Sequence, residues 1–433
     1  MNAKEKPDRA DASPYRWAAL GAYMLITIAV EAQWVALAPV ARAAGSFYGS
    51  RIPASSPFGI DFLAMSYLLV FLVASLPASF AIDAWGLRAG LVIGAALAGA
   101  GGLLKGFAAA EWGAVLCGQL LLALAQPFIL NAATTLGARW FPLRERGLAV
   151  ALASLAQFLG IVLAMVLGPI IVDGDPASTL YGSGTDRLLL IYGVGTATAA
   201  VVAAIIVKDG PAGSTREARR GVGSPVEGLR LLLASRDFRL LLVLFAAGLG
   251  IFNALSSLVD AVAAHIGVVD SDGMIGTVMI AGGIVGALVL PILSDAAARR
   301  KPFLTLCMAG MIPGVAGLAW ARIIAPDPGS AYLVAKVASG ILGFFVMAAG
   351  PIGFQYAAEI GRPAPESTSQ GLLLLVGQAT GIGFMALMGT PGLMGPTLAI
   401  FVGFAALCFA GTFLLKESTL LDEARAERKS AIR

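Results

Sequence analysis

The sequence predicts an all-α membrane protein with twelve transmembrane helices, and three observations support this fold class. Of the 433 residues, 58% are hydrophobic and only 13% are charged, whereas a soluble domain carries roughly 25% charged residues. The mean hydropathy is +0.84. Twelve apolar stretches have about the 20 residues that a spanning helix needs. These stretches are continuous rather than alternating every second residue, which excludes an outer-membrane β-barrel.

The apolar stretches divide evenly between the two halves of the chain. We expect spans at 17–41, 58–82, 89–108, 112–137, 147–171, 188–207, 238–263, 273–294, 302–322, 330–357, 369–388 and 396–415. Between the sixth and seventh spans lies a polar stretch rich in Gly, Pro, Ser and cations, which favours a loop. The predicted organisation is a leader at 1–16, a six-helix bundle at 17–207, a loop at 208–237, a second six-helix bundle at 238–415 and a tail at 416–433.

The basic residues predict the orientation of the chain. Of the 30 Lys and Arg residues, only six fall outside the segments on the N-terminal side of the membrane. Four lie in the opposite loops and two, Lys105 and Lys336, lie near the opposite helix ends. By the positive-inside rule, both termini are expected in the cytoplasm of a multi-pass protein of the inner (plasma) membrane. The net charge of +4 is thereby explained without nucleic acid as a partner, and no cleavable signal is expected before the first span.

The two halves repeat each other in two places. Connections after spans 2 and 8 each place an acid at an inner helix end with cations beyond it, namely Asp83 with Arg88 and Asp295 with Arg299. Spans 5 and 11 share one spacing of an acid, a glutamine and a glycine: Glu145, Gln157 and Gly160, and Glu366, Gln378 and Gly381. Pseudo-symmetric six-span halves with a site between them are typical of transporters.

Polar side chains at membrane depth are costly unless they are paired or face a wet cavity, so they are the candidates for a binding site. The candidates are Glu31 and Trp34 in span 1, Tyr67 in span 2, Asn131 in span 4, Gln157 in span 5, Asn253 in span 7, Gln355 in span 10 and Gln378 in span 11. In contrast, Glu359 falls at a helix end and is expected to be solvated.

Four of these candidates suggest how a solute is held. Glu31 and Trp34 are three residues apart and share a helix face, and an aromatic face beside a carboxylate suits a small organic cation. Gln157 and Gln378 lie roughly 15 Å from the inner ends of their spans, near the midplane, where amides add directional hydrogen bonds. The alternatives are that Trp34 belongs to an interfacial aromatic belt and that each Gln only joins two helices.

Several kinds of site are missing from the sequence. No Arg lies deep in a span, so a carboxylate or phosphate solute would lack a bidentate partner. There is no Walker-type loop for ATP, and no Cys/His cluster for a metal or haem, so no cofactor is expected. Cys117, Cys307 and Cys408 are an odd trio in apolar stretches, which excludes a disulfide scaffold. An enzyme is disfavoured because nucleophile–base pairs are absent from the spans.

The acid–cation connections after spans 2 and 8 resemble the signature of the major facilitator superfamily, in which these charges are implied to act as a latch at the cytoplasmic gate. The gate residues implied here are Asp83, Arg88, Asp295 and Arg299, although Ser79 stands where the family has a leading glycine. Four segments also resemble the feline leukaemia virus subgroup C receptor-related transporters: EAQW from Glu31, IDFLAMSYLL from Ile60, FILNAATTLGARWF from Phe128 with LAQFLG at Gln157, and PIGFQYAAEIGRPAPESTSQG from Pro351 with VGQATG at Gln378.

The second resemblance implies transport of choline or ethanolamine, with haem also proposed in that family. It implies that Trp34 cages an ammonium group and that Gln157 and Gln378 line the site. Asn253 aligns with a second cage aromatic of the family, which weakens the cage, and Glu31 replaces an expected small neutral residue. Glu31 therefore supplies counter-charge or binds a proton.

The leading hypothesis is a monomeric transporter that moves a small, cationic organic solute by alternating access of two bundles. A proton-coupled multidrug or metabolite exporter, with Glu31 as the proton site, is the rival within transport. A membrane receptor that transports nothing is the rival from another class. A flux that does not respond to a proton gradient would count against the exporter, and thermal stabilisation by no small molecule would favour the receptor. Stabilisation by anions alone would contradict the argument from the missing deep Arg.

Overall fold

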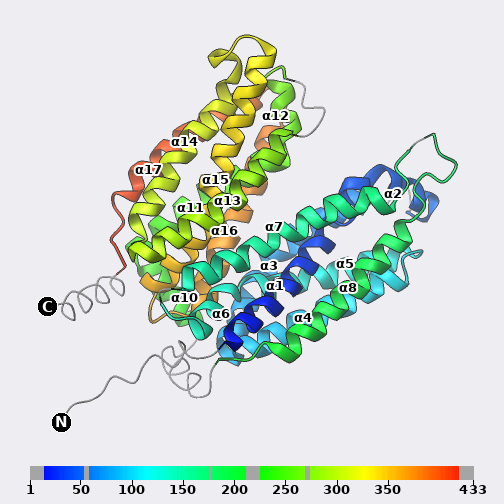
Figure 1. The fold of residues 1–433 in the computed structure, drawn as a ribbon, viewed down its shortest axis with the longest axis horizontal. Coiled ribbons are helices and arrows are strands. Elements are labelled where there is room, and N and C mark those ends of the chain that lie inside the picture. The colour runs from blue at the N-terminus through cyan, green and yellow to red at the C-terminus, as the bar shows by residue number, and fades with distance from the viewer. Residues whose placement is uncertain are drawn as a thin grey trace. The chain divides into compact units, whose positions relative to one another are not determined.

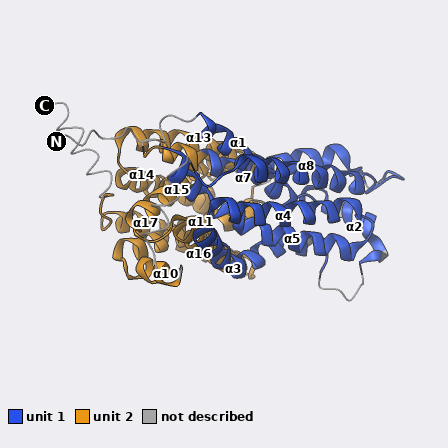
Figure 2. Cartoon of the chain, turned by 90° about the horizontal axis from the view of Figure 1, so that it is seen from below, with its two compact units in different colours: residues 1–141, 152–220 blue, residues 142–151, 221–433 orange. Residues whose placement is uncertain are grey.

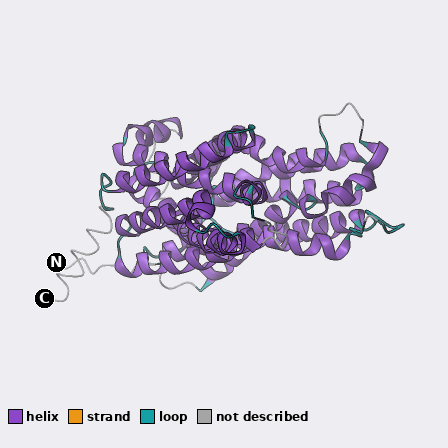
Figure 3. Ribbon diagram, turned by 90° about the horizontal axis from the view of Figure 1, so that it is seen from above, coloured by secondary structure: helices purple, strands orange, loops and turns teal. Residues whose placement is uncertain are grey.

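The structure, a computed structural model, describes residues 14–52, 58–143, 145–175, 177–210, 225–268 and 274–418. This described part is built of helices (Figure 1). Loops connect the helices, and no strand occurs in these ranges (Figure 3). Twelve of these described helices are long and apolar enough to cross a membrane. Each overlaps one predicted span, so the predicted fold class is confirmed. Most of the predicted leader, residues 211–224 of the predicted loop, and the tail from residue 419 lie outside the described residues.

The chain divides into two compact units (Figure 2). Unit 1 contains residues 1–141 and 152–220, and unit 2 contains residues 142–151 and 221–433. The helices of unit 1 are α1 (Tyr15–Trp34), α2 (Ala41–Tyr48), α3 (Ile60–Trp85), α4 (Leu87–Phe107), α5 (Trp112–Leu130), α6 (Ala133–Trp140), most of α7 (Arg146–Ile171) and α8 (Thr185–Ile206). The first six residues of α7 group with unit 2.

Glycines bring the helices of unit 1 close together. A Cβ atom at Gly193 of α8 would overlap the carbonyl oxygen of Gly102 on α4, and one at Gly118 of α5 would lie 2.6 Å from the carbonyl oxygen of Gly101. Small residues allow such approaches in membranes, where close packing rather than burial from water holds helices together. Helix α4 therefore packs tightly between α5 and α8.

Two predicted spans of unit 1 are interrupted. The first span ends as an α-helix at Trp34 and continues through a 3-10 turn (Ala38–Val40) into α2. The fourth span breaks between α5 and α6, four residues after Pro127, which cannot donate a helical hydrogen bond. At this break Asn131 donates to the carbonyl oxygen of Ser75 (3.0 Å) and to Oγ of Ser79 (2.9 Å). Asn131, a predicted solute ligand, therefore joins α5 to α3.

The helices of unit 2 are α10 (Pro225–Ala234), α11 (Arg236–Ser257), α12 (Val259–His265), α13 (Met274–Ala297), α14 (Lys301–Ile324), α15 (Pro328–Ile360), α16 (Glu366–Gly389) and α17 (Met394–Thr412). The longest, α15, packs against α13 and α14 on one side and contacts α11 and α16. The prediction of a loop at 208–237 is wrong for α10. The second half of the predicted loop is rich in leucine and forms this helix, in which Leu232 is buried against Gly361.

Candidate functional site

An aromatic pair stands at the end of α1. The indole N–H of Trp34 donates to the carbonyl oxygen of Ala64 (2.8 Å) on α3. Its ring stacks on Tyr67, with centroids 6.2 Å apart and planes 22° apart. Tyr67 is fully buried, and its hydroxyl donates to the carbonyl oxygen of Val30 (3.5 Å). Both predicted aromatic residues are therefore together, and hydrogen bonds hold their orientation.

A cavity of about 290 Å³ adjoins this pair and lies wholly within unit 1. Its walls come from the ends of α1 and α2, the 3-10 turn between them, and helices α3, α4 and α5. The lining residues are Trp34, Leu37, Ala38, Ala41, Ile60, Leu63, Ala64, Lys105 and Gln119. The wall is thus apolar except for an indole, one ammonium and one amide, and this composition is typical of small-molecule sites.

Lys105 is the residue of this cavity that the sequence reasoning missed. It was expected near a helix end, but only 1% of it is exposed. Its Nζ donates to Oε1 of Gln119 (2.5 Å) and to the carbonyl oxygen of Gln33 (3.2 Å). Across the described ranges, no carboxylate forms an ion pair with it. Three glycines near it in the sequence, Gly101, Gly102 and Gly106, lie where α4 is closely packed. They are the sequence signal from which the burial of Lys105 could have been predicted.

Glu31 is buried one helical turn before Trp34, with 2% exposure. Its Oε1 accepts a hydrogen bond from Nε2 of Gln126 on α5 (2.7 Å). None of the ion pairs among the described residues involves Glu31. A Cβ atom on Gly160 of α7 would lie 2.8 Å from Cβ of Glu31, so α7 packs on this side of α1. The half-buried Gln157 lies three residues earlier on α7, on the same side of that helix.

The predicted ligands of unit 2 contact each other. Nδ2 of Asn253 on α11 donates to Oε1 of Gln378 on α16 (3.0 Å), and both side chains are half-buried. Gly381, one turn after Gln378, permits the approach, because its added Cβ would lie 3.0 Å from Cβ of Asn253. Asn253 and Gln378, which were both predicted to line the solute site, are thus hydrogen-bonded to each other.

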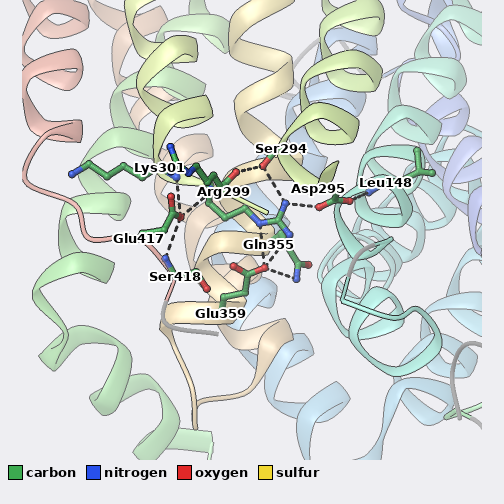
Figure 4. A network of polar contacts seen from close by, with 10 residues as sticks. Leu148, Ser294, Asp295, Arg299, Lys301, Gln355, Glu359, Glu417 and Ser418 are labelled. Carbon is green, nitrogen blue, oxygen red and sulfur yellow. Dashed lines mark hydrogen bonds and ion pairs between the residues drawn. The ribbon is translucent and has the colours of Figure 1, made fainter. Parts of the chain in front are cut away.

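Asp295, the acid predicted after span 8, belongs to a buried network in unit 2 (Figure 4). The cation of this network is Arg300 and not the predicted Arg299. Arg300 forms ion pairs with Asp295 (2.5 Å) and with Glu359 (3.0 Å), and its side chain is 1% exposed. Arg299 is exposed, and its carbonyl oxygen accepts from Oγ of Ser294 (2.6 Å). The turn at Ala298, whose φ is +50°, directs the second arginine inward and leaves the first outside.

This network corrects the expectation for Glu359 and contains one of the predicted solute ligands, Gln355. Glu359, expected to be solvated, is buried, because α15 continues to Ile360 and places it beside Arg300. Gln355, expected in the solute site, lies one turn earlier and donates from Nε2 to Oε1 of Glu359 (3.1 Å). Glu417 adds an acceptor for the backbone N–H groups of Arg300 and Lys301, at 2.9 and 3.2 Å.

Asp295 also caps the first turn of α7. Its Oδ2 accepts from the backbone N–H of Leu148 (2.9 Å), one of the N-terminal donors that have no partner within their own helix. A carboxylate there also interacts favourably with the helix dipole. A Cβ atom on Gly147 would overlap the Asp295 carboxylate, so glycine is needed at this approach.

In unit 1, the corresponding connection, between α3 and α4, is bound by Asp209, an acid that the sequence did not predict. Oδ1 of Asp209 accepts from the backbone N–H of Arg88 (3.0 Å) and from Nη1 of Arg139 (3.1 Å). Gly86, with φ of +104°, joins α3 to α4 and leaves room for this carboxylate, since a Cβ would lie 2.6 Å from it. Asp83 lies in the last turn of α3. Asp209 follows α8 without any motif, so no sequence signal pointed to it.

No group of three or more His, Cys, Asp or Glu residues in the described part of the chain is arranged to hold a metal ion. The hydrogen-bonding groups of the cavity are the Lys105 ammonium, the Gln119 amide and the Trp34 indole N–H, and the last two already have protein partners. They can bind and orient a small organic molecule.

Comparison with known proteins identifies the fold and its family. Residues 19–386 match the model of the Major Facilitator Superfamily. Solute carrier family 49 member A3 of Danio rerio is 29% identical over 376 residues, covering 84% of this chain and 76% of its own length. The choline/ethanolamine transporter FLVCR2 of Homo sapiens is 26% identical over 386 residues, covering 86% and 71%.

Solved structures agree on the fold. The proton:xylose symporter XylE superimposes with a TM-score of 0.72 at 13% identity, covering 93% of this chain and 96% of its own. The transporter FucP in its outward conformation superimposes with a TM-score of 0.67 at 16% identity, covering 92% and 98%. The twelve helices, the repeated acid–cation connections and these matches together show that the chain belongs to the Major Facilitator Superfamily of membrane transporters.

Proposed function

We propose that this transporter moves a small organic solute with an ammonium group, similar to choline or ethanolamine, by alternating access of its two six-helix bundles. The observation that carries the proposal is the Trp34–Tyr67 pair, oriented by hydrogen bonds, with Trp34 lining a 290 Å³ cavity. A cation over an indole face gains about 2 kcal/mol when it is desolvated. The names of similar proteins as choline/ethanolamine transporters support the same solute class.

Other residues have supporting roles in this proposal. Glu31, one turn before Trp34, supplies negative charge to the bundle interior. The roles of Gln157, Gln378 and Asn253 as solute ligands stay predictions from the sequence, and none of the three lines the cavity of unit 1. The Asp295 carboxylate, which caps α7 and pairs with Arg300, is the proposed gate contact at the cytoplasmic end. The positive-inside distribution of Lys and Arg supports cytoplasmic termini in a plasma or inner membrane, and the proposed transporter is a monomer.

A second candidate function is proton-coupled transport through Glu31. This carboxylate is buried, and its hydrogen-bond donor is the neutral amide of Gln126. With no cation paired to it among the described residues, a bound proton is one way in which its charge can be compensated. If coupling exists, flux driven by a pH gradient should be lost in Glu31→Gln while solute exchange without a gradient continues.

Calorimetric titration of choline into the protein in nanodiscs tests the proposed site. Loss of the indole in Trp34→Leu should weaken binding by about 30-fold, because about 2 kcal/mol of cation–π attraction is removed. Trp34→Phe should retain part of the affinity, since it keeps an aromatic face.

Trp17→Leu is the matched control, because Trp17 also lies on α1 but is 43% exposed. The neutral isostere 3,3-dimethylbutanol should bind weakly to every variant. Equal choline affinity in the Trp34→Leu and Trp17→Leu proteins would remove Trp34 from the site.

A further inference from the structure

Unit 1 contains two buried groups of opposite formal charge, Glu31 and Lys105. Glu31 precedes Trp34 by one turn of α1, with the neutral amide of Gln126 as its hydrogen-bond donor. Lys105 lines the same cavity as Trp34, and its Nζ donates to the carbonyl oxygen of Gln33. Neither group takes part in an ion pair with another described residue. The bundle therefore contains an acid and a base that it does not neutralise by direct contact.

The Lys105 ammonium has one N–H donor and a positive charge that its protein neighbours do not compensate. A protonated lysine has three N–H donors, and the hydrogen bonds of Lys105 use two, to Gln119 and to the Gln33 carbonyl. Both acceptors are neutral, whereas a buried ammonium is costly unless an anion compensates it. Because Lys105 lines the cavity, an anionic group there could reach its Nζ.

Among solutes with an ammonium group, the composition of the cavity favours one that also carries an anionic group over one whose only charge is positive, such as choline. No carboxylate is among the lining residues, and the one formally charged side chain is Lys105. A cation on the Trp34 face would share this small cavity with the Lys105 ammonium, which repels it. A solute that also carries a carboxylate would replace this repulsion with a charge-assisted hydrogen bond.

We propose that the cavity binds a zwitterion with an ammonium group and a carboxylate, its carboxylate on Lys105 and its ammonium group on the Trp34 face. This inference rests on the proposed function and narrows its solute class. The carboxylate offsets the charge of the Lys105 ammonium, and the ammonium group gains from the face of the indole. The volume of about 290 Å³ is at the lower limit of small-molecule sites, so the solute has only a few carbon atoms.

Three probes of matched shape separate the contributions of the two charges. Glycine betaine carries both a trimethylammonium group and a carboxylate. Choline keeps the cation but replaces the carboxylate with a hydroxymethyl group, and 3,3-dimethylbutyrate keeps the carboxylate but replaces the cation with a neutral tert-butyl group. Calorimetric titration of each into the full-length protein in nanodiscs gives three affinities. Betaine should bind at least about tenfold more tightly than either of the other probes.

Two variants test Lys105 as the origin of this preference. Lys105→Met keeps an unbranched side chain but removes the charge, and Gln119→Glu places an internal carboxylate beside Lys105 and competes with the solute. Both should abolish the preference for betaine over choline. Gln119→Glu supplies a partner for the buried ammonium, so it should fold even if Lys105→Met does not. Lys336→Met is the matched control, because Lys336 lies near a helix end in unit 2, over the Tyr332 ring.

Each outcome decides the inference. Choline binding as tightly as betaine, 3,3-dimethylbutyrate binding as tightly as betaine, or an unchanged betaine preference in the folded variants would overturn the zwitterion assignment. Binding of choline without betaine would overturn it and leave the proposed function intact. Binding of neither ammonium compound would overturn both.

Discussion

Replacing Arg300 by Met should destabilise unit 2 far more than replacing its neighbour Arg299. Arg300 is the cation between two buried carboxylates, and the side chains of Asp295 and Glu359 are only 6% and 2% exposed. Its removal would leave both acids buried without a counter-ion. Breaking one buried ion pair in this way costs about 3–5 kcal/mol, and two pairs share this arginine.

The expected loss is therefore at least about 3 kcal/mol of unfolding free energy. Unfolding by SDS in mixed micelles measures it, with far-ultraviolet circular dichroism as the signal. Arg299→Met is the matched control, because this exposed side chain should contribute within about 0.5 kcal/mol.

A charge-neutral triple variant tests the physical reason for the loss. Asp295→Asn and Glu359→Gln, combined with Arg300→Met, remove the two stranded charges and should recover part of the stability. Equal losses for Arg299→Met and Arg300→Met would refute the assignment of the buried cation. A triple variant less stable than Arg300→Met alone would refute the argument from uncompensated charge.

Two other contacts lead to further predictions. Gly147→Ala should lower stability by about 1–3 kcal/mol, since the new methyl group would overlap the Asp295 carboxylate; Gly195→Ala on α8 has open space and should be neutral or slightly stabilising in the same denaturation assay. Asn253→Ala and Gln378→Ala should show a coupling of about 1 kcal/mol in a double-mutant cycle of solute-free stability, as expected for one hydrogen bond. Additive losses would mean that these two amides act independently.

Hydropathy and local repeats were enough to predict the twelve spans, because a membrane helix must carry a continuous apolar run whatever it packs against. The same reasoning placed Trp34 and Glu31 on one face of a helix, and that joint role stays a prediction. The reasoning could not show that α1 stops at Trp34 or that Asn131 closes the break after Pro127 with bonds to α3. Those features depend on contacts between helices.

The errors over charged residues have a common physical cause. Lys105, Arg300 and Glu359 all lie near helix ends, where long side chains commonly reach the interface. Lys105 is buried because the glycines around it bring α5 and α8 close to α4. Arg300 is buried because the turn at Ala298 rotates it toward Glu359. Sequence position alone did not distinguish these environments from a hydrated surface.

The most direct test of the central claim is solute counterflow in proteoliposomes. Vesicles containing the purified protein and preloaded with unlabelled choline should take up external radiolabelled choline transiently and saturably. The Trp34→Leu protein should take up much less, while the Trp17→Leu protein should match the unaltered chain. Uptake no greater than in protein-free vesicles, or equal uptake by the Trp34→Leu protein, would contradict transport of an ammonium solute on the Trp34 face.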